Sequence, residues 1–114
     1  MNGTDHAMDI MTPVELSRRL RLPAPPRLLD VREPAEHALG ALPGATLIPL
    51  GDLVSRAGEL AGAEDAEWVV YCHHGIRSAR AAGLLHQMGF TRVWNLSGGV
   101  DRWAAEVDPA FPRY

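Results

Sequence analysis

The sequence predicts a single small α/β domain with a central parallel sheet and helices on both faces. Apolar runs that suit buried strands alternate along the chain with stretches that suit helices. The clearest strand pattern, residues 68–71, shows no polar alternation, which is typical of a strand buried on both faces. The 114 residues are enough for one hydrophobic core and too few for two domains. We therefore expect one domain over residues 1–114, of which residues 1–10 form a flexible N-terminal extension.

The N-terminal half begins with a helix signal. Thr12 can cap the helix, Pro13 suits its first position, and Glu15 can bond back to the cap. Three prolines within residues 23–26 prevent this helix from continuing. The next expected elements are a strand over 27–31, a short helix over 33–37, a turn at 43–44, a strand over 45–48 and helical turns over 50–60.

The C-terminal half carries the strongest patterns. The strand over 68–71 is followed by an amphipathic stretch over 77–88, which predicts a helix that ends at Gly89. A further strand is expected over 93–96, then a loop over 97–99 and a final helix over 100–106. Trp94 and Trp103 are expected in the core. Elsewhere, His37 and His86 are expected as solvated helix residues.

Composition excludes several classes of protein. All 11 basic residues are arginines, so Schiff-base and P-loop lysine chemistry are excluded. A net charge of −3 provides no basic face, and we expect no nucleic-acid partner. No apolar run is long enough to span a bilayer and no signal peptide is recognisable, so we expect no membrane partner. With Cys72 as its single cysteine, the protein is expected in the reducing cytoplasm.

Charge is unevenly distributed along the chain. Residues 68–100 contain no carboxylate but carry three arginines. A cationic segment in an acidic protein suits a small anionic ligand. The same pattern also fits buried strands and a core helix that simply avoid carboxylates.

Cys72 lies where the clearest strand ends and the strongest helix is about to begin. In open α/β sheets, ligands bind at this carboxyl end of the strands. Gly75 permits a backbone conformation in which successive N–H groups turn inward, and the helix adds its positive end. The sequence thus predicts a cysteine that is ionised at neutral pH and acts as a nucleophile. The alternative is a small buried hydrophobic residue at a strand end.

Four motifs in order resemble the rhodanese-like sulfurtransferases. The first is the loop of residues 72–78, Cys-His-His-Gly-Ile-Arg-Ser, which we call the cysteine loop. The others are residues 28–33, residues 40–45 with 48–50, and residues 89–90 with 96–99 and Trp103. Together they extend over about 75 residues, nearly the whole chain. The resemblance implies the rhodanese-like fold.

The resemblance also implies a thiosulfate-type sulfurtransferase without a cofactor. In such enzymes the loop cysteine takes sulfur from a small anionic donor and passes it, as a persulfide, to cyanide or to a thiol. The thiol can belong to a protein such as a thioredoxin. The alternative is a non-catalytic persulfide carrier or binding module within an assembly. Related phosphatases and arsenate reductases have one residue more between cysteine and arginine than the four present here. The shorter loop should hold a sulfur atom well and a phosphate poorly.

Each residue of the cysteine loop has an expected role. Cys72 is the nucleophile, and the N–H groups of the following residues, His73, His74, Gly75, Ile76, Arg77 and Ser78, bind the anion. Ser78 caps the helix or bonds to the thiolate.

The two arginines near the loop allow more than one arrangement. Arg77 faces the donor or pairs with Asp30, and we favour the pair because an unpaired buried carboxylate is costly. Arg32 is then expected at the mouth of the substrate site.

The adjacent histidines are not expected to bind a metal. Side chains at neighbouring positions point in different directions, and one cysteine beside two histidines does not match a zinc-site spacing. They are expected to shape the entrance and to add weak, pH-dependent positive charge. Family members that have arginine or lysine here would attract the thiosulfate dianion better. A protein persulfide or a low-molecular-weight persulfide is therefore an alternative donor.

Overall fold

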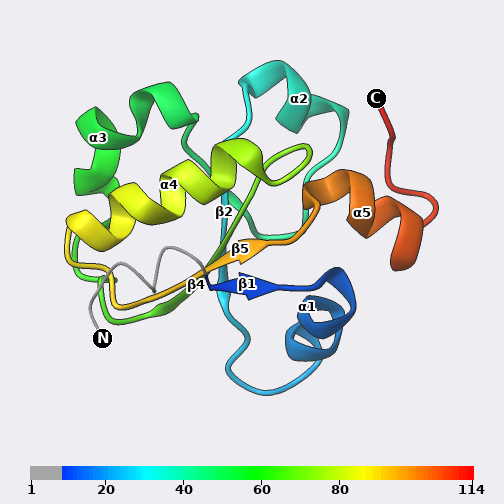
Figure 1. Cartoon of the computed structure of the whole chain (residues 1–114), viewed down its shortest axis with the longest axis horizontal. Helices are drawn as coiled ribbons and strands as arrows, with labels where there is room; N and C mark the ends of the chain where they lie inside the picture. The colour runs from blue at the N-terminus through cyan, green and yellow to red at the C-terminus, as the bar shows by residue number, and fades with distance from the viewer. Residues whose placement is uncertain (1–8) are drawn as a thin grey trace.

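Five parallel strands form one sheet at the centre of the molecule (Figure 1). The computed structural model describes residues 9–114. The strands are β1 (Ile10–Met11), β2 (Arg27–Asp30), β3 (Thr46–Leu47), β4 (Glu67–Tyr71) and β5 (Arg92–Leu96). They are arranged in the order β1-β5-β4-β2-β3, and every neighbouring pair is parallel. The carboxyl ends of β2 and β4 coincide, because Asp30 pairs with Tyr71.

Helices cover both faces of this sheet. They are α1 (Pro13–Leu20), α2 (Pro34–Leu39), α3 (Leu53–Arg56), α4 (Ile76–Gln87) and α5 (Gly99–Glu106), with 3₁₀ turns at Leu50–Asp52 and Ala57–Leu60. In Figure 1, α3 and α4 lie on one side of the sheet, and α1 and α5 lie on the other. The predicted α/β class with helices on both faces is confirmed. Within residues 9–114, no helix is long and apolar enough to cross a bilayer.

The core consists of two clusters, one on each face. Trp68, Val70 and Cys72 belong to the cluster under α4, whereas Val69 and Tyr71 belong to the cluster under α1 and α5. All of these side chains are buried. As predicted, β4 shows no polar alternation because both of its faces are covered.

The first helix starts as the sequence predicts, with one difference. Thr12 Oγ1 accepts a hydrogen bond from Glu15 N at 3.2 Å and caps α1. The carboxylate of Glu15, however, binds Arg18 at 2.6 and 2.9 Å rather than bonding back to the cap. The reciprocal bond forms in α2 instead, where Glu33 N donates to Glu36 Oε1 at 3.0 Å.

The expected boundary of the N-terminal extension is wrong. Ile10 and Met11 form the edge strand β1, paired with Asn95 and Leu96 of β5. Two residues are too few for a periodic pattern, so the sequence showed no strand here. Residues 1–8 of the expected extension lie outside the described part of the chain.

The predictions for isolated histidines and tryptophans were partly wrong. Trp103 is buried as expected, but Trp94 is only partly buried and donates its indole N–H to Glu67 Oε2 at 2.8 Å. His86 places Nδ1 2.9 Å from Phe90 O, so it is not simply solvated. His37 also has a buried partner, Asp30.

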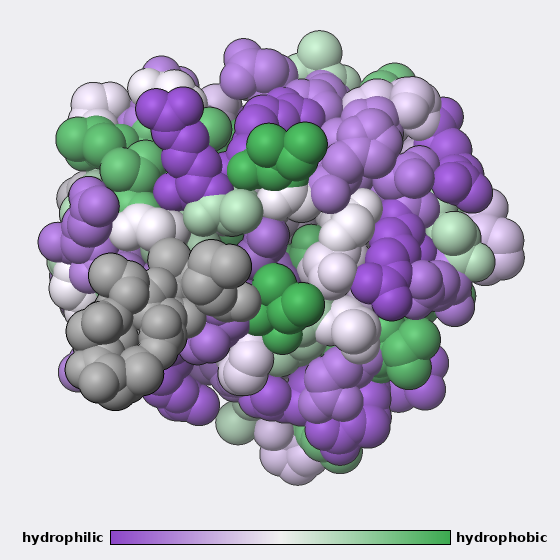
Figure 2. Space-filling view, in the orientation of Figure 1, coloured by the Kyte–Doolittle hydropathy of each residue, from purple (hydrophilic) through white to green (hydrophobic). Residues whose placement is uncertain are grey.

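Hydrophilic residues dominate the face of the molecule drawn in Figure 2, and apolar side chains form small separate groups there. One of the large exposed apolar residues, Ile76, belongs to the cysteine loop and is 81% exposed.

Candidate active site

Cys72 directly follows β4 at the carboxyl end of the sheet and is 1% exposed. Its Sγ atom accepts hydrogen bonds from Gly75 N at 3.1 Å and from Ser78 N at 3.4 Å. The N–H groups of Ile76 and Arg77, in the first turn of α4, have no acceptor within the helix. The structure thus places two of the expected main-chain donors, Gly75 N and Ser78 N, at the sulfur, which lies beside the N-terminal, positive end of α4.

The curvature of the loop depends on Gly75. Its φ of +99° lies in the left-handed region, where side chains are strained. A Cβ atom at this position would also lie 3.3 Å from Gly98 N and 3.5 Å from Leu96 O. The backbone after β5 thus packs closely against the loop, and the left-handed conformation is the main reason that this position favours glycine.

A second glycine brings α5 against the loop. At Gly99, a Cβ atom would lie 2.4 Å from His73 O and 2.5 Å from Cys72 O. Val100 N donates to Cys72 O and Asp101 N donates to His73 O, both at 3.0 Å. The loop and the start of α5 are therefore joined through their backbones.

Ser78 and Asn95 form a polar pair beneath the sulfur. The hydroxyl of Ser78 lies 3.4 Å from Cys72 Sγ and 2.5 Å from Asn95 Oδ1. The amide of Asn95 is oriented by Gly75, whose carbonyl accepts from Asn95 Nδ2 at 3.1 Å. Because a serine hydroxyl has one proton, it donates either to the sulfur or to Asn95 at any moment. Asn95 is not among the predicted site residues, since a buried asparagine in an apolar strand carries no motif.

The expected pair between Arg77 and Asp30 is wrong, because Arg32 binds that carboxylate. Arg32 Nε and Nη2 donate to Asp30 at 2.8 to 3.2 Å, and Arg32 N adds a bond at 2.9 Å. Both side chains are fully buried. Arg32 therefore does not stand at the mouth of the substrate site. Because Arg32 lies two residues after Asp30, its main-chain N–H and its guanidinium can both reach the Asp30 carboxylate.

Asp30 is held as a carboxylate by its partners. Burial raises the pKa of Asp30, but hydrogen bonds from Arg32 and His37 outweigh burial and hold the pKa below its ordinary value. His37 Nδ1 lies 2.8 Å from Asp30 Oδ2, so the expectation of a solvated His37 is also wrong.

Arg77 instead binds Glu36 of α2. Its Nη1 and Nη2 donate to the two carboxylate oxygens at 2.6 and 2.9 Å. Hydrogen bonding to Arg77 lowers the pKa of Glu36 to about 2, although partial burial opposes the shift. The Arg77 side chain is 34% exposed, so it remains in contact with solvent.

Tyr114 packs onto the cysteine loop, a contact that no sequence pattern predicts. Its ring stacks on His73 with centroids 3.8 Å apart. Its hydroxyl donates to Glu36 Oε2 at 2.8 Å and accepts from Arg32 Nη1 at 3.1 Å. Tyr114 therefore connects the two ion pairs. No local pattern could reveal these contacts, because Tyr114 lies 41 positions from His73, 78 from Glu36 and 82 from Arg32.

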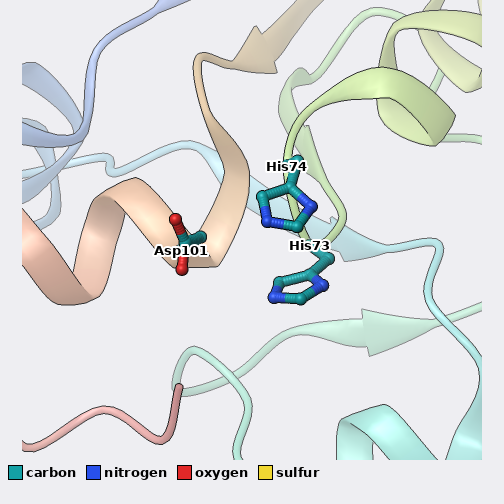
Figure 3. Close-up of side chains that lie close together, drawn as sticks. All are labelled: His73, His74 and Asp101. Atoms are coloured by element: carbon teal, nitrogen blue, oxygen red, sulfur yellow. The ribbon is translucent and has the colours of Figure 1, made fainter. Parts of the chain in front are cut away.

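His73 and His74 do not diverge as expected. Their rings stack with centroids 3.8 Å apart, and both lie near Asp101 (Figure 3). Burial lowers the pKa of His73, and the neighbouring His74 lowers it further. At neutral pH the His73 imidazole therefore carries less positive charge than an ordinary histidine.

Of the predicted site residues, the structure places Gly75 and Ser78 in contact with Cys72 Sγ. The side chain of Arg77 turns to Glu36, that of Ile76 is exposed, and Arg32 and Asp30 form a buried pair. Glu36, Asn95, Asp101 and Tyr114 complete the surroundings and were missed. Asp101 lies two positions after the predicted loop at 97–99, but no sequence pattern indicated its contact with the cysteine loop.

Comparison with known proteins gives consistent matches. The rhodanese-like domain family matches residues 12–106. A protein of Allochromatium vinosum named sulfurtransferase is 40% identical over 89 residues, which are 78% of this chain and 81% of that protein. The uncharacterised protein YqhL of Bacillus subtilis is 40% identical over 81 residues, 71% of this chain. The crystal structure of a rhodanese-like domain protein from Staphylococcus aureus superposes with a TM-score of 0.80 at 27% identity and covers 94% of this chain and 99% of that one.

Several relatives are longer than this chain. It spans 63% of YqhL and 43% of the putative sulfur carrier protein YrkF of Bacillus subtilis. The matched segment nevertheless contains the whole sheet from β2 to β5 and the cysteine loop. By this match and by its fold, the chain belongs to the rhodanese-like domain family, several of whose members are named sulfurtransferases.

Proposed function

We propose that the protein is a sulfurtransferase that carries sulfur as a persulfide on Cys72. The observation that carries this proposal is the contact of Cys72 Sγ with the N–H groups of Gly75 and Ser78, at 3.1 and 3.4 Å. Donors in this position stabilise negative charge on sulfur, both on the attacking thiolate and on the stored persulfide.

The proposed reaction has two displacements. The Cys72 thiolate attacks the outer sulfur of thiosulfate, the S–S bond of the donor breaks, and sulfite leaves with the electron pair. An acceptor thiolate then attacks the outer sulfur of the Cys72 persulfide and restores the thiolate; with cyanide as the acceptor, the product is thiocyanate. The acceptor thiol can belong to a protein such as a thioredoxin, and the reducing cytoplasm is the proposed setting.

The size of the loop favours sulfur over phosphate. Four residues separate Cys72 from Arg77, and Arg77 is bound by Glu36 rather than turned toward Sγ. A phosphate dianion would therefore enter a small site whose nearest arginine already has a partner. A persulfide sulfur needs only the main-chain donors.

Because Cys72 is the only cysteine in the chain, no second thiol of the same chain can discharge its persulfide. The sulfur therefore remains available until an external acceptor arrives. This property also suits the second candidate function, a persulfide carrier, which is supported by the likeness to a relative named a putative sulfur carrier protein.

Mass spectrometry tests the persulfide directly. Incubation of the reduced protein with thiosulfate should add one sulfur, about 32 Da, to Cys72, and cyanide should remove it. Cys72→Ser should gain no mass and keep its fold, and Ser55→Ala, which changes a hydroxyl on α3, serves as the matched control. If thiosulfate and low-molecular-weight persulfides all leave the mass of the wild-type protein unchanged, the proposal is wrong.

A turnover assay separates the enzyme from the carrier. Steady release of sulfite from thiosulfate in the presence of cyanide or a thiol supports a sulfurtransferase. Loading of one sulfur without turnover on any acceptor supports a carrier.

A further inference from the structure

Three side chains that the proposed sulfur transfer does not use meet beside the cysteine loop. His73 and His74 come from the loop after β4, and Asp101 comes from the first turn of α5. One potential ligand atom from each residue lies within 4.8 Å of the other two. Figure 3 shows that each imidazole presents a ring nitrogen on the side of the Asp101 carboxylate.

The backbone holds these three residues together without any ligand. Asp101 N donates to His73 O at 3.0 Å, so the main chain of one ligand residue is bonded to the main chain of another. The absence of a side chain at Gly99 allows this approach. A site whose residues are already positioned loses less conformational entropy when it binds an ion.

The ligand atoms are also available. His73 Nε2 is buried and has no hydrogen-bond partner among the described residues. Burial removes the hydrogen bond that this nitrogen would make to water, and no group within residues 9–114 replaces it, which costs free energy. Both contacts of Asp101 with Arg113, at 3.1 and 3.3 Å, fall on Oδ1, so Oδ2 is not engaged by that arginine. His74 is exposed.

The donor set selects the class of ion. Two imidazoles and one carboxylate suit borderline divalent transition metals, and they suit Mg²⁺ and Ca²⁺ poorly because those ions prefer oxygen ligands. Zinc sites with three protein ligands and an open fourth position are common. We propose that His73, His74 and Asp101 bind one divalent transition-metal ion, with Zn²⁺ as the best match.

Cys72 is not a ligand of this site. Its sulfur faces the N–H groups of Gly75 and Ser78 and does not belong to the cluster of potential ligand atoms. A metal ion would therefore lie at the edge of the cysteine loop as a separate positive charge. At the edge of the cysteine loop, this charge would attract an anion. Arg77 does not provide that attraction, because Glu36 binds it.

Calorimetric titration with Zn²⁺ tests the site. The reduced, chelator-treated full chain should bind one Zn²⁺. His74→Gln and Asp101→Asn should each weaken binding by at least about tenfold, because each removes one of three ligands. Circular dichroism checks that both variants are folded. Titration with Co²⁺ should produce d–d absorption bands without a sulfur-to-cobalt charge-transfer band.

Two control variants keep the test specific. His37→Gln changes a histidine outside the site, and Cys72→Ser removes the thiol; both should bind Zn²⁺ as the wild-type chain does. Because Cys72→Ser cannot form a persulfide, the result is independent of the proposed sulfur transfer. The inference is overturned if the wild-type chain binds no Zn²⁺, if His74→Gln and Asp101→Asn bind it unchanged, or if Cys72→Ser loses it.

Discussion

Two arginines near the cysteine loop have opposite surroundings. Arg32 is fully buried and binds Asp30, the Gly40 carbonyl and the Tyr114 hydroxyl. Arg77 lies on the first turn of α4, is 34% exposed, and binds Glu36. The contrast teaches that one ion pair belongs to the interior that supports the site, whereas the other belongs to its surface. Breaking the interior pair would leave a fully buried charge without a partner, whereas the side chains of the surface pair are in contact with solvent.

Breaking the interior pair should have the largest effect on stability. Arg32→Met leaves the Asp30 carboxylate buried without its main partner, and we expect a loss of about 3–5 kcal/mol in the free energy of unfolding. Urea denaturation measures it. The double variant Asp30→Asn/Arg32→Met should recover part of the loss, since the unpaired charge is gone. A loss below about 1 kcal/mol in Arg32→Met would contradict the distinction between the two arginines.

Breaking the surface pair should cost less. Glu36→Gln removes the charge that binds Arg77 and Tyr114. We expect a loss of about 1–2 kcal/mol in the free energy of unfolding, because the side chains of Glu36 and Arg77 are both partly solvated. Glu59→Gln, which breaks the more exposed pair with Arg56, is the matched control and should lose less. If Glu36→Gln and Glu59→Gln lose the same unfolding free energy, the position of the Glu36 pair beside the cysteine loop adds no stability.

Acid should remove the contribution of the surface pair. The pKa of Glu36 is lowered to about 2 by Arg77, from an ordinary value of 4.5. A carboxylate with a depressed pKa stabilises the fold above its unfolded pKa and loses this contribution as pH falls through its folded pKa. The difference in unfolding free energy between wild type and Glu36→Gln should therefore be constant from pH 7 to about 5 and shrink between about 4.5 and 2. A difference that grows on acidification would contradict this assignment.

The smallest effect is expected where the two pairs meet. Tyr114→Phe removes the hydroxyl that joins Arg32 to Glu36 but keeps the ring on His73, and we expect a loss of about 0.5–1 kcal/mol. Thermal or urea denaturation measures it. A loss as large as that of Arg32→Met would mean that Tyr114, rather than Asp30, holds the buried arginine.

Much of the fold was predictable because it depends on local pattern. The strand before Cys72 and the helix after it were placed within a residue or two, since an unbroken apolar run and an amphipathic repeat are strong local signals. The cap at Thr12 was predicted for the same reason. Strand β1 was missed because two residues are held in the sheet by β5 and not by their own pattern.

The candidate site was predicted only in part. The main-chain donors around Cys72 follow from Gly75 and from the helix start, which are adjacent in sequence. The partner of each arginine was not predictable, because several carboxylates were possible and the choice depends on distance in the folded chain. Asp101 and Tyr114 reach the loop from other elements and left no local signal of that contact.

By itself, the sequence determined the parallel α/β architecture and a cysteine at the carboxyl end of a buried strand, because hydrophobic periodicity and glycine positions act over a few residues. Only the tertiary structure decided which arginine is buried against Asp30, which one remains at the surface with Glu36, and which carboxylate faces the paired histidines. These are contacts between charged side chains on separate elements, and their energies depend on burial and distance, which exist only once the sheet has brought the elements together.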